Sequence, residues 1–366
     1  KREILGGIAV LPQRMHPPSL HGVALMVALM WTALLGSLML ITPALLLLPL
    51  PFESTRRAYR EWNGFVAKQW FLLATFLLER FANVRVVLSG DELPLGEPAL
   101  IVCNHRTRID WMFMWCLCAR LGLLDTMKIA LKETLKSVPG FGWAMQAFMF
   151  VFLARDKARD LQHMESVLLY HTSNAHPLSL ILFPEGTDLS PENQARSDAY
   201  AAQNSLPKYK YVLHPKVVGW SRSVSLLRET CAAVYDVTIA YHDFSEDERP
   251  TEVSLLSARY PREVHLHVQR HKMALLPEAP AELEQWCRSS FQRKEKRLQQ
   301  FYNSNPKRFG AEVAPPIPPN ELDALFRSSL GFWAGLSVIA AVSLCLVFGW
   351  VYAAFATAAW VMVGRA

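Results

Sequence analysis

The sequence predicts an α/β fold with a mostly parallel sheet flanked by helices, together with N-terminal and C-terminal transmembrane helices. In residues 83–310, short β-branched or apolar runs alternate with helical patterns, which is typical of such a domain. No residue from Gly22 to Phe52 or from Ser328 to Gly364 carries a charge. A helix of about 20 apolar residues is enough to cross a bilayer core. We therefore expect a membrane-anchoring segment with an interfacial helix in residues 1–82, and a linker with a transmembrane segment in residues 311–366.

Each uncharged stretch allows more than one arrangement in a membrane. Pro43 permits a kink or a tight turn, so the first stretch is either one tilted span or a hairpin that enters the bilayer and returns. The second is one span with a tail, or two short spans that meet near Gly349. A buried helix of a soluble protein is the alternative for both, and their length without charge argues against it. The aromatic-rich run Trp62–Phe81 predicts a helix in the membrane interface or, equally, a helix packed on the domain.

The central region divides into short strands and longer helices. Candidate strands begin near residues 84, 99, 148, 178, 212, 236 and 263, and candidate helices are Arg108–Leu121, Ala158–Thr172, Glu192–Ala202, Ser221–Ala233 and Ala281–Tyr302. Lys128, Lys132 and Lys136 recur every four residues and predict the solvated face of one more helix. The Pro-rich run at 315–320 is typical of a linker.

Composition and cysteine spacing exclude several classes of function. The net charge of +6 suits an anionic membrane surface or anionic substrates. Basic patches interleaved with glycine and aromatic residues are missing from the sequence, so we predict no nucleic-acid partner. The 6 cysteines form no CxxC pair, which predicts reduced thiols rather than a zinc site or a disulfide framework. His265, His267 and His271 lie close together, but no cysteine or carboxylate cluster in the sequence completes a site there, so we predict no metal.

The stretch CNHRTRIDWMFMW, residues 103–115, places polar residues between two apolar segments. The run before it predicts a strand and the run after it a helix, so Asn104–Arg108 lie on the turn between them. Ligands of open α/β sheets bind at the carboxyl ends of strands, which makes this turn the expected place for a site. A simpler alternative is that Thr107 and Asp110 form a capping box, and that His105 is a turn residue without chemistry.

The pair His105 and Asp110 has the chemistry of a general base with an orienting partner. A neutral imidazole removes a proton from an alcohol near neutral pH. A carboxylate bonded to its other ring nitrogen sets the tautomer and stabilises the imidazolium that forms. The sequence has no GxSxG motif, so we expect the substrate to bring its own hydroxyl. This role is compatible with capping, because a carboxylate at a helix start is well placed to hold an imidazole on the preceding turn.

These motifs resemble those of a known family. The spacing in NHRTRID (104–110) is followed by FLAR (152–155), FPEGT (183–187) and VLHPKVVG (212–219) in the order found in the membrane-bound glycerolipid acyltransferases. The resemblance covers roughly residues 20 to 305, and the longer strings around these motifs look most like the lysocardiolipin acyltransferase branch. It implies that residues 83–310 are the catalytic domain, that acyl-CoA is the co-substrate without a further cofactor, and that the other partners are a lysophospholipid acceptor and membrane lipid.

The resemblance also assigns roles to residues. His105 matches the base of the family and Asp110 its orienting carboxylate. Residues at positions implied in acceptor binding or site architecture are Asn104, Arg155, Glu185, Gly186 and Thr187. Arginine is a natural bidentate partner for phosphate, and the alternative for Arg155 is a surface salt bridge with Asp156 or Asp160. The alternative for Glu185 is a structural carboxylate bonded to backbone amides.

The expected function is an acyl-CoA-dependent O-acyltransferase that reacylates a lysophospholipid such as lysocardiolipin or lysophosphatidylinositol. Alternatives are a 1-acylglycerol-3-phosphate acyltransferase that makes phosphatidate, a non-catalytic lipid-binding membrane protein, and a hydrolase. Many phosphatidate-forming relatives carry a basic residue where this chain has Asp188, which weakens the first alternative. Basic residues at 293–308 precede the last apolar stretch, so we expect an integral protein of the endoplasmic reticulum whose catalytic domain faces the cytosol.

Overall fold

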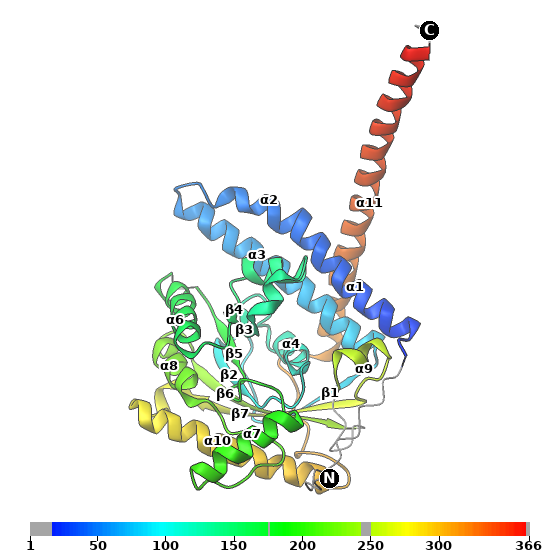
Figure 1. Cartoon of the computed structure of the whole chain (residues 1–366). Coiled ribbons are helices and arrows are strands. Elements are labelled where there is room, and N and C mark those ends of the chain that lie inside the picture. The colour runs from blue at the N-terminus through cyan, green and yellow to red at the C-terminus, as the bar shows by residue number, and fades with distance from the viewer. Residues whose placement is uncertain (1–16, 175, 243–249, 364–366) are drawn as a thin grey trace, which may run out of the picture.

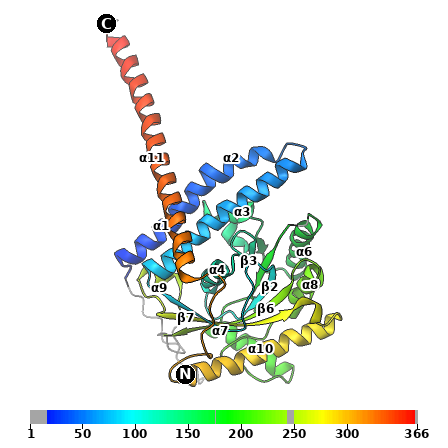
Figure 2. The same cartoon turned by 180° about the vertical axis from the view of Figure 1, so that it is seen from behind.

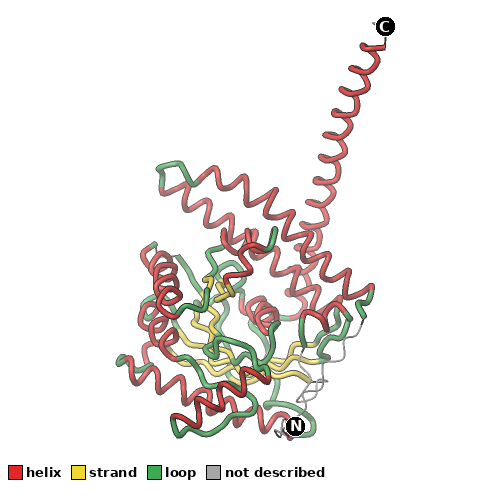
Figure 3. The backbone as a smooth tube through the Cα atoms, in the orientation of Figure 1, coloured by secondary structure: helices red, strands yellow, loops and turns green. Residues whose placement is uncertain are grey.

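A seven-stranded sheet forms the centre of the computed structural model, which describes residues 17–174, 176–242 and 250–363 (Figure 3). The strands are β1 (Arg85–Gly90), β2 (Ala99–Cys103), β3 (Met127–Lys132), β4 (Val151–Leu153), β5 (Ser179–Leu182), β6 (Ala233–His242) and β7 (Glu263–Lys272), in the order β1-β7-β6-β2-β5-β3-β4. Neighbouring strands are parallel except β6 and β7, which are antiparallel. The predicted α/β fold with a mostly parallel sheet is therefore confirmed.

Helices cover both faces of the sheet (Figure 1; from behind in Figure 2). One face carries α4 (Asp110–Leu121) and α5 (Phe141–Ala147) with the N-terminal helices, and the other carries α6 (Lys157–Ser173), α8 (Val217–Leu227) and α10 (Pro280–Asn303). The other helical pieces of the domain are α7 (Pro191–Gln203), α9 (Glu252–Leu256), η4 (Glu133–Ser137) and η5 (Met273–Leu275). In β2, Ile101 and Cys103 join one core, whereas Leu100 and Val102 join the other. The strand is buried on both faces, which explains why its sequence is a continuous apolar run.

Two predicted elements are wrong, and a third, the helix predicted at 221–233, is shifted. Lys128 and Lys132 belong to strand β3 rather than to a helix face, and Lys128 is buried. Two lysines four residues apart hid this strand, because they lower the apolar signal of a segment that lies inside the sheet. The helix predicted at 221–233 begins and ends earlier, since Ala233 already starts β6.

The strand predicted at residue 212 is a loop fixed by a side chain. The backbone N–H groups of Lys210, Tyr211 and Val212 donate to the Glu295 carboxylate of α10 at 2.7, 2.8 and 3.1 Å. A carboxylate from a helix thus replaces the sheet partner that the apolar sequence suggested.

The N-terminal helices form an antiparallel pair along one side of the domain (Figure 1). The first arm consists of α1 (Leu20–Gly36), η1 (Ser37–Ile41), α2 (Thr42–Ala44) and η2 (Leu45–Leu47), and the second of α3 (Glu53–Phe76) and η3 (Leu77–Phe81). The second arm packs against α4, and its Val66, Trp70 and Phe71 are buried. Trp62–Phe81 is therefore a helix packed on the domain, the second of the two predicted arrangements.

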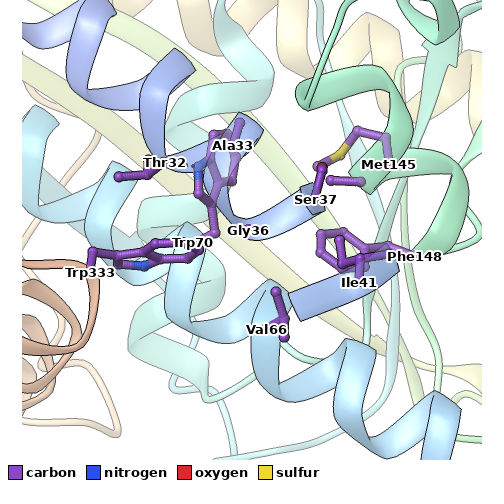
Figure 4. A pocket seen from close by; sticks show the side chains of 11 residues that line it. Thr32, Ala33, Gly36, Ser37, Ile41, Val66, Trp70, Met145, Phe148 and Trp333 are labelled. Carbon is purple, nitrogen blue, oxygen red and sulfur yellow. Dashed lines mark hydrogen bonds between the residues drawn. The ribbon is translucent and has the colours of Figure 1, made fainter. Parts of the chain in front are cut away.

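The last helix, α11 (Pro319–Val363), is continuous through Gly349 and projects away from the domain (Figure 1). Its base is anchored on α3, where Ser329 Oγ and Trp333 Nε1 donate to the Gln69 carbonyl at 2.6 and 3.0 Å. Figure 4 shows the small apolar cavity where α1, α3, α5 and α11 meet. By length and composition alone, Leu20–Leu47 and Pro319–Thr357 are able to cross a membrane.

Candidate active site

The turn after β2 is tied to the neighbouring strand β6 by Asn104. Its side-chain Nδ2 donates to the Ile239 carbonyl at 3.2 Å, and the Ile239 N–H donates back to Oδ1 at 2.8 Å. The side chain is fully buried. This two-way bond positions the start of the turn, and the predicted contact between Asn104 and substrate stays a prediction.

His105 and Asp110 meet as the sequence spacing predicts. His105 Nδ1 lies 2.9 Å from Asp110 Oδ2. The imidazole packs on the Phe183 ring at 4.5 Å between centroids, and 18% of the His105 side chain stays exposed. Because Nδ1 faces the carboxylate, Nε2 is the nitrogen left for a substrate. Within the described parts of the chain, no hydrogen bond to Nε2 is formed.

The Asp110 carboxylate is fully buried and accepts further hydrogen bonds. The Thr107 backbone N–H donates to Oδ2 at 2.8 Å, and the Thr107 hydroxyl donates to Oδ1 at 3.2 Å. The first of these bonds is one of the two bonds of the predicted capping box. In the other, the Thr107 hydroxyl should accept the N–H of Asp110, but it bonds a different residue. Thr107 Oγ1 accepts the N–H of Ile109 at 3.2 Å, and the helix begins only at Asp110. Helix capping and orientation of the imidazole therefore coexist in one carboxylate.

A tyrosine that the sequence pattern did not single out also reaches this carboxylate. The Tyr241 hydroxyl, at the end of β6, donates to Asp110 Oδ1. Burial, together with the nearby Asp110 carboxylate, raises the pKa of Tyr241 well above its usual value, so the hydroxyl remains a donor. The residue is 131 positions away in sequence, and only strand pairing brings it here.

Glu185 braces the turn rather than facing an open site. Its Oε1 accepts the His105 backbone N–H at 2.7 Å, and its Oε2 accepts the Leu213 N–H at 2.8 Å. The side chain is only 2% exposed, and burial raises the pKa of its carboxyl group. The Leu189 N–H donates to the His105 carbonyl at 2.9 Å. The main chain of His105 is thus held on both sides by the segment that follows β5.

Gly186 and Thr187 complete this segment. Gly186 has φ +71°, a conformation that side chains rarely adopt, and a β-carbon there would lie 3.0 Å from Lys216 Nζ. Asn193 Nδ2 donates to Thr187 Oγ1 and to the Asp188 carbonyl, each at 2.8 Å. Lys216, which sequence reasoning passed over, therefore places an exposed ammonium group beside the turn.

Arg155 lies farther along the sheet, after the edge strand β4, and β5 and β3 separate that strand from β2. The predicted salt bridges are not formed, because both carboxylates accept backbone N–H groups. Asp160 Oδ2 accepts the N–H of Arg155 at 2.9 Å, and Asp156 caps α6. The guanidinium is exposed and makes no ion pair with any residue that the structure describes.

Cysteine and metal chemistry find little support at this site. All 6 cysteines are described and unpaired, and burial raises the pKa of the Cys103 thiol beside the turn well above its usual value. His265 does not group with His267 and His271 but with His242 and Glu263, whose possible ligand atoms lie within 4.8 Å of one another. Glu263 is already paired with Arg85 at 2.9 Å. That no metal is needed stays a prediction.

Comparisons with known proteins identify the family and the relatives of this chain. The profile of the family described as Acyltransferase matches residues 85–241, and that of Acyltransferase C-terminus matches residues 254–328. Lysocardiolipin acyltransferase 1 of Danio rerio is 40% identical over 89% of this chain and 87% of its own length. Lysophosphatidylinositol acyltransferase 10 of Caenorhabditis elegans is 33% identical over 77% of this chain and 72% of its own length. Probable 1-acyl-sn-glycerol-3-phosphate acyltransferase 5 of Arabidopsis thaliana is also 33% identical, with 68% and 65% covered.

The chain therefore belongs to the acyltransferase family and is an acyltransferase. The family predicted from the sequence motifs is confirmed.

Proposed function

We propose that this acyltransferase moves an acyl group from acyl-CoA to the free hydroxyl of a lysophospholipid, with His105 as the general base. The observation that carries the proposal is the 2.9 Å contact of Nδ1 with the buried Asp110 carboxylate, which leaves Nε2 to face a substrate. Acyl-CoA is a co-substrate, and no further cofactor is required by this chemistry.

The reaction follows from this geometry. Nε2 takes the proton of the acceptor hydroxyl while its oxygen attacks the thioester carbonyl carbon. The tetrahedral intermediate collapses, the C–S bond breaks, and the imidazolium returns the proton to the departing CoA thiolate. The Asp110 carboxylate stabilises the imidazolium through Nδ1–H. Asn104 and Glu185 hold the main chain on either side of His105 and thereby position its ring.

The acceptor is a lysophospholipid with a phosphodiester headgroup, such as lysocardiolipin or lysophosphatidylinositol. The names of the Danio rerio and Caenorhabditis elegans relatives support this choice. Asp188 supports it chemically, because a carboxylate repels a phosphate monoester with nearly two charges more than a diester with one. Gly186 and Thr187 lie beside it. The ammonium group of Lys216 and the guanidinium of Arg155, which has no ion-pair partner among the described residues, are cations for anionic groups of the substrates.

The second candidate is a 1-acylglycerol-3-phosphate acyltransferase that makes phosphatidate. The name of the Arabidopsis thaliana relative favours it, at a lower identity than that of the first relative. The two candidates share the catalytic pair and differ only in the acceptor.

The protein acts at a membrane, most simply that of the endoplasmic reticulum, with its catalytic domain in the cytosol where acyl-CoA is found. The support is the apolar helix α11, whose residues 338–357 are mostly exposed. A long-chain lysophospholipid stays in the bilayer and presents its hydroxyl at the interface.

The deciding assay measures thiol release from acyl-CoA by purified protein, with and without a lysophospholipid, and identifies the product by mass spectrometry. Thiol release that depends on lysophosphatidylinositol or lysocardiolipin, with the diacyl or fully acylated product, is the expected result. Release without an acceptor would indicate a hydrolase. If no lysophospholipid acceptor gives thiol release, the protein would be a lipid-binding protein without catalysis.

A further inference from the structure

Tyr241 is held in the active site from three elements. It is the second-last residue of strand β6 and is fully buried. Its ring meets Phe113 of α4 edge to face, with centroids 5.6 Å apart, and its backbone N–H donates to the Tyr302 hydroxyl of α10 at 3.2 Å. Its own hydroxyl donates to Asp110 Oδ1. The ring position is therefore fixed independently of the hydroxyl.

The two oxygens of Asp110 have separate tasks. Oδ2 accepts His105 Nδ1 at 2.9 Å and the Thr107 N–H at 2.8 Å. Oδ1 accepts the hydroxyls of Thr107 and Tyr241. An ionised carboxylate offers about four lone-pair sites, so these four donors occupy it completely. With both oxygens held, the plane of the carboxylate does not rotate away from the imidazole.

The bond from Tyr241 is the long-range one among those to Asp110. Thr107 is three residues away and His105 five, so their bonds come from the turn itself. Tyr241 instead connects the turn to the sheet. A phenylalanine would fill the same apolar surroundings, and a buried hydroxyl costs stability unless it is bonded. The bond to Asp110 therefore explains why this buried position carries a hydroxyl group.

We propose that Tyr241 is a positioning residue for acyl transfer: its hydroxyl fixes Oδ1 of Asp110, so that Oδ2 holds the His105 imidazole with Nε2 toward the acceptor. The inference rests on the roles proposed above for His105 and Asp110. Tyr241 itself exchanges no proton in the reaction.

The test is Tyr241→Phe, with Tyr235→Phe as the matched control. Tyr235 lies on the same strand, is fully buried, and donates its hydroxyl to Glu97 Oε2 at 2.7 Å. Each variant loses one tyrosine–carboxylate bond, but only Tyr241→Phe loses the bond to Asp110. We expect Tyr241→Phe to lower kcat about 10-fold or more, because loss of a group that orients a catalytic side chain misplaces it. KM for acyl-CoA and for the lysophospholipid should stay unchanged, as should kcat of Tyr235→Phe.

A double-mutant cycle shows whether Tyr241 acts through Asp110. In an Asp110→Asn background, Tyr241→Phe should cause little further loss of kcat, because the group that it positions is already altered. Equal losses in both backgrounds, an unchanged kcat in Tyr241→Phe, or the same loss in Tyr235→Phe would each overturn the inference. His105→Ala separates the two proposals. If that variant is inactive while Tyr241→Phe equals the parent, only the role of Tyr241 fails, whereas an active His105→Ala overturns the proposed mechanism itself.

Discussion

The Glu185 carboxylate and the backbone N–H of His105 are joined by a hydrogen bond of 2.7 Å, so the turn after β5 holds the main chain of the catalytic turn after β2. The other oxygen of Glu185 accepts the Leu213 N–H at 2.8 Å. One buried carboxylate thus joins three segments that are distant in sequence. We expect its contribution to activity to act through geometry, because both of its oxygens accept backbone N–H groups.

Glu185→Ala is expected to lower both stability and activity. Two buried N–H groups lose their acceptor, at about 1–3 kcal/mol each, and the His105 main chain is released. Denaturant unfolding in detergent measures the loss of stability, and kcat per folded molecule measures the loss of positioning.

Glu295→Ala is the control for this prediction. Glu295 accepts three backbone N–H groups of the 210–212 loop, which adjoins Leu213, but the carboxylate of Glu295 makes no hydrogen bond to the described His105 turn. This variant should lose comparable stability but keep kcat per folded molecule. If Glu185→Ala keeps it as well, then Glu185 does not position the base.

His105→Ala is expected to remove acyl transfer while the protein stays folded and inserted in the membrane. The side chain lies on a turn and is partly exposed, so its loss opens no large cavity. General-base assistance is worth about 10²–10⁴-fold, and kcat should fall by that factor. The kcat of Asp110→Asn should fall nearly as far, because Asp110 is bonded to the imidazole itself. Activity near that of the parent, or an unfolded His105→Ala protein, would contradict the assignment.

The contact between His105 and Asp110 could be predicted from the sequence because it is local. A strand, a short turn and a helix bring two residues five positions apart together whatever the rest of the fold does. Tyr241 reaches the same carboxylate only because β6 lies next to β2, and no local pattern contains that pairing. Likewise, the sequence could not show which groups donate hydrogen bonds to the Glu185 carboxylate. The backbone N–H groups of His105 and Leu213 reach this carboxylate only after three segments have folded together.

Buried His171 is expected to make the protein sensitive to acid. It is 2% exposed, and neither ring nitrogen has a hydrogen-bond partner among the described residues. Burial, aided by the nearby charge of Lys128, lowers its pKa to about 3. Between pH 6.5 and that value the unfolded chain binds a proton that the folded chain does not. Stability should therefore fall as the pH drops below 6.5, by up to about 1.4 kcal/mol per pH unit.

Thermal unfolding of the parent and of His171→Phe between pH 7.5 and 5 checks this. The variant should gain stability relative to the parent as the pH falls. A difference between His171→Phe and the parent that is independent of pH would exclude the effect.

The catalytic domain is expected to face the cytosol. Basic residues between 293 and 308 precede α11, and the positive-inside tendency places them on the cytosolic side. Lys294 is buried against Asp236, so the exposed charges of this group are those of Arg293, Lys296 and Arg308. Protease added to sealed, cytosol-side-out vesicles should digest residues 84–310. If this region is protected until detergent is added, the catalytic domain faces the lumen instead, and the prediction is wrong.

The acceptor preference is expected to depend on Asp188. This partly exposed carboxylate follows Gly186 and Thr187, and Asn193 Nδ2 fixes its main chain at 2.8 Å. A carboxylate there disfavours a compact phosphate monoester with nearly two charges more strongly than a phosphodiester with one.

We therefore expect lysophosphatidylinositol or lysocardiolipin to be acylated faster than lysophosphatidate when the acceptors compete at equal concentration in mixed micelles. Asp188→Arg should raise the share of lysophosphatidate, and Asp188→Asn should raise it less, because it removes the repulsion without adding an attraction. Asp198→Arg, which makes the same charge change on α7, should leave the ratio unaltered. If lysophosphatidate is the fastest acceptor of the parent and Asp188→Arg does not increase its share, the protein is a phosphatidate-forming acyltransferase, and Asp188 does not determine the acceptor preference.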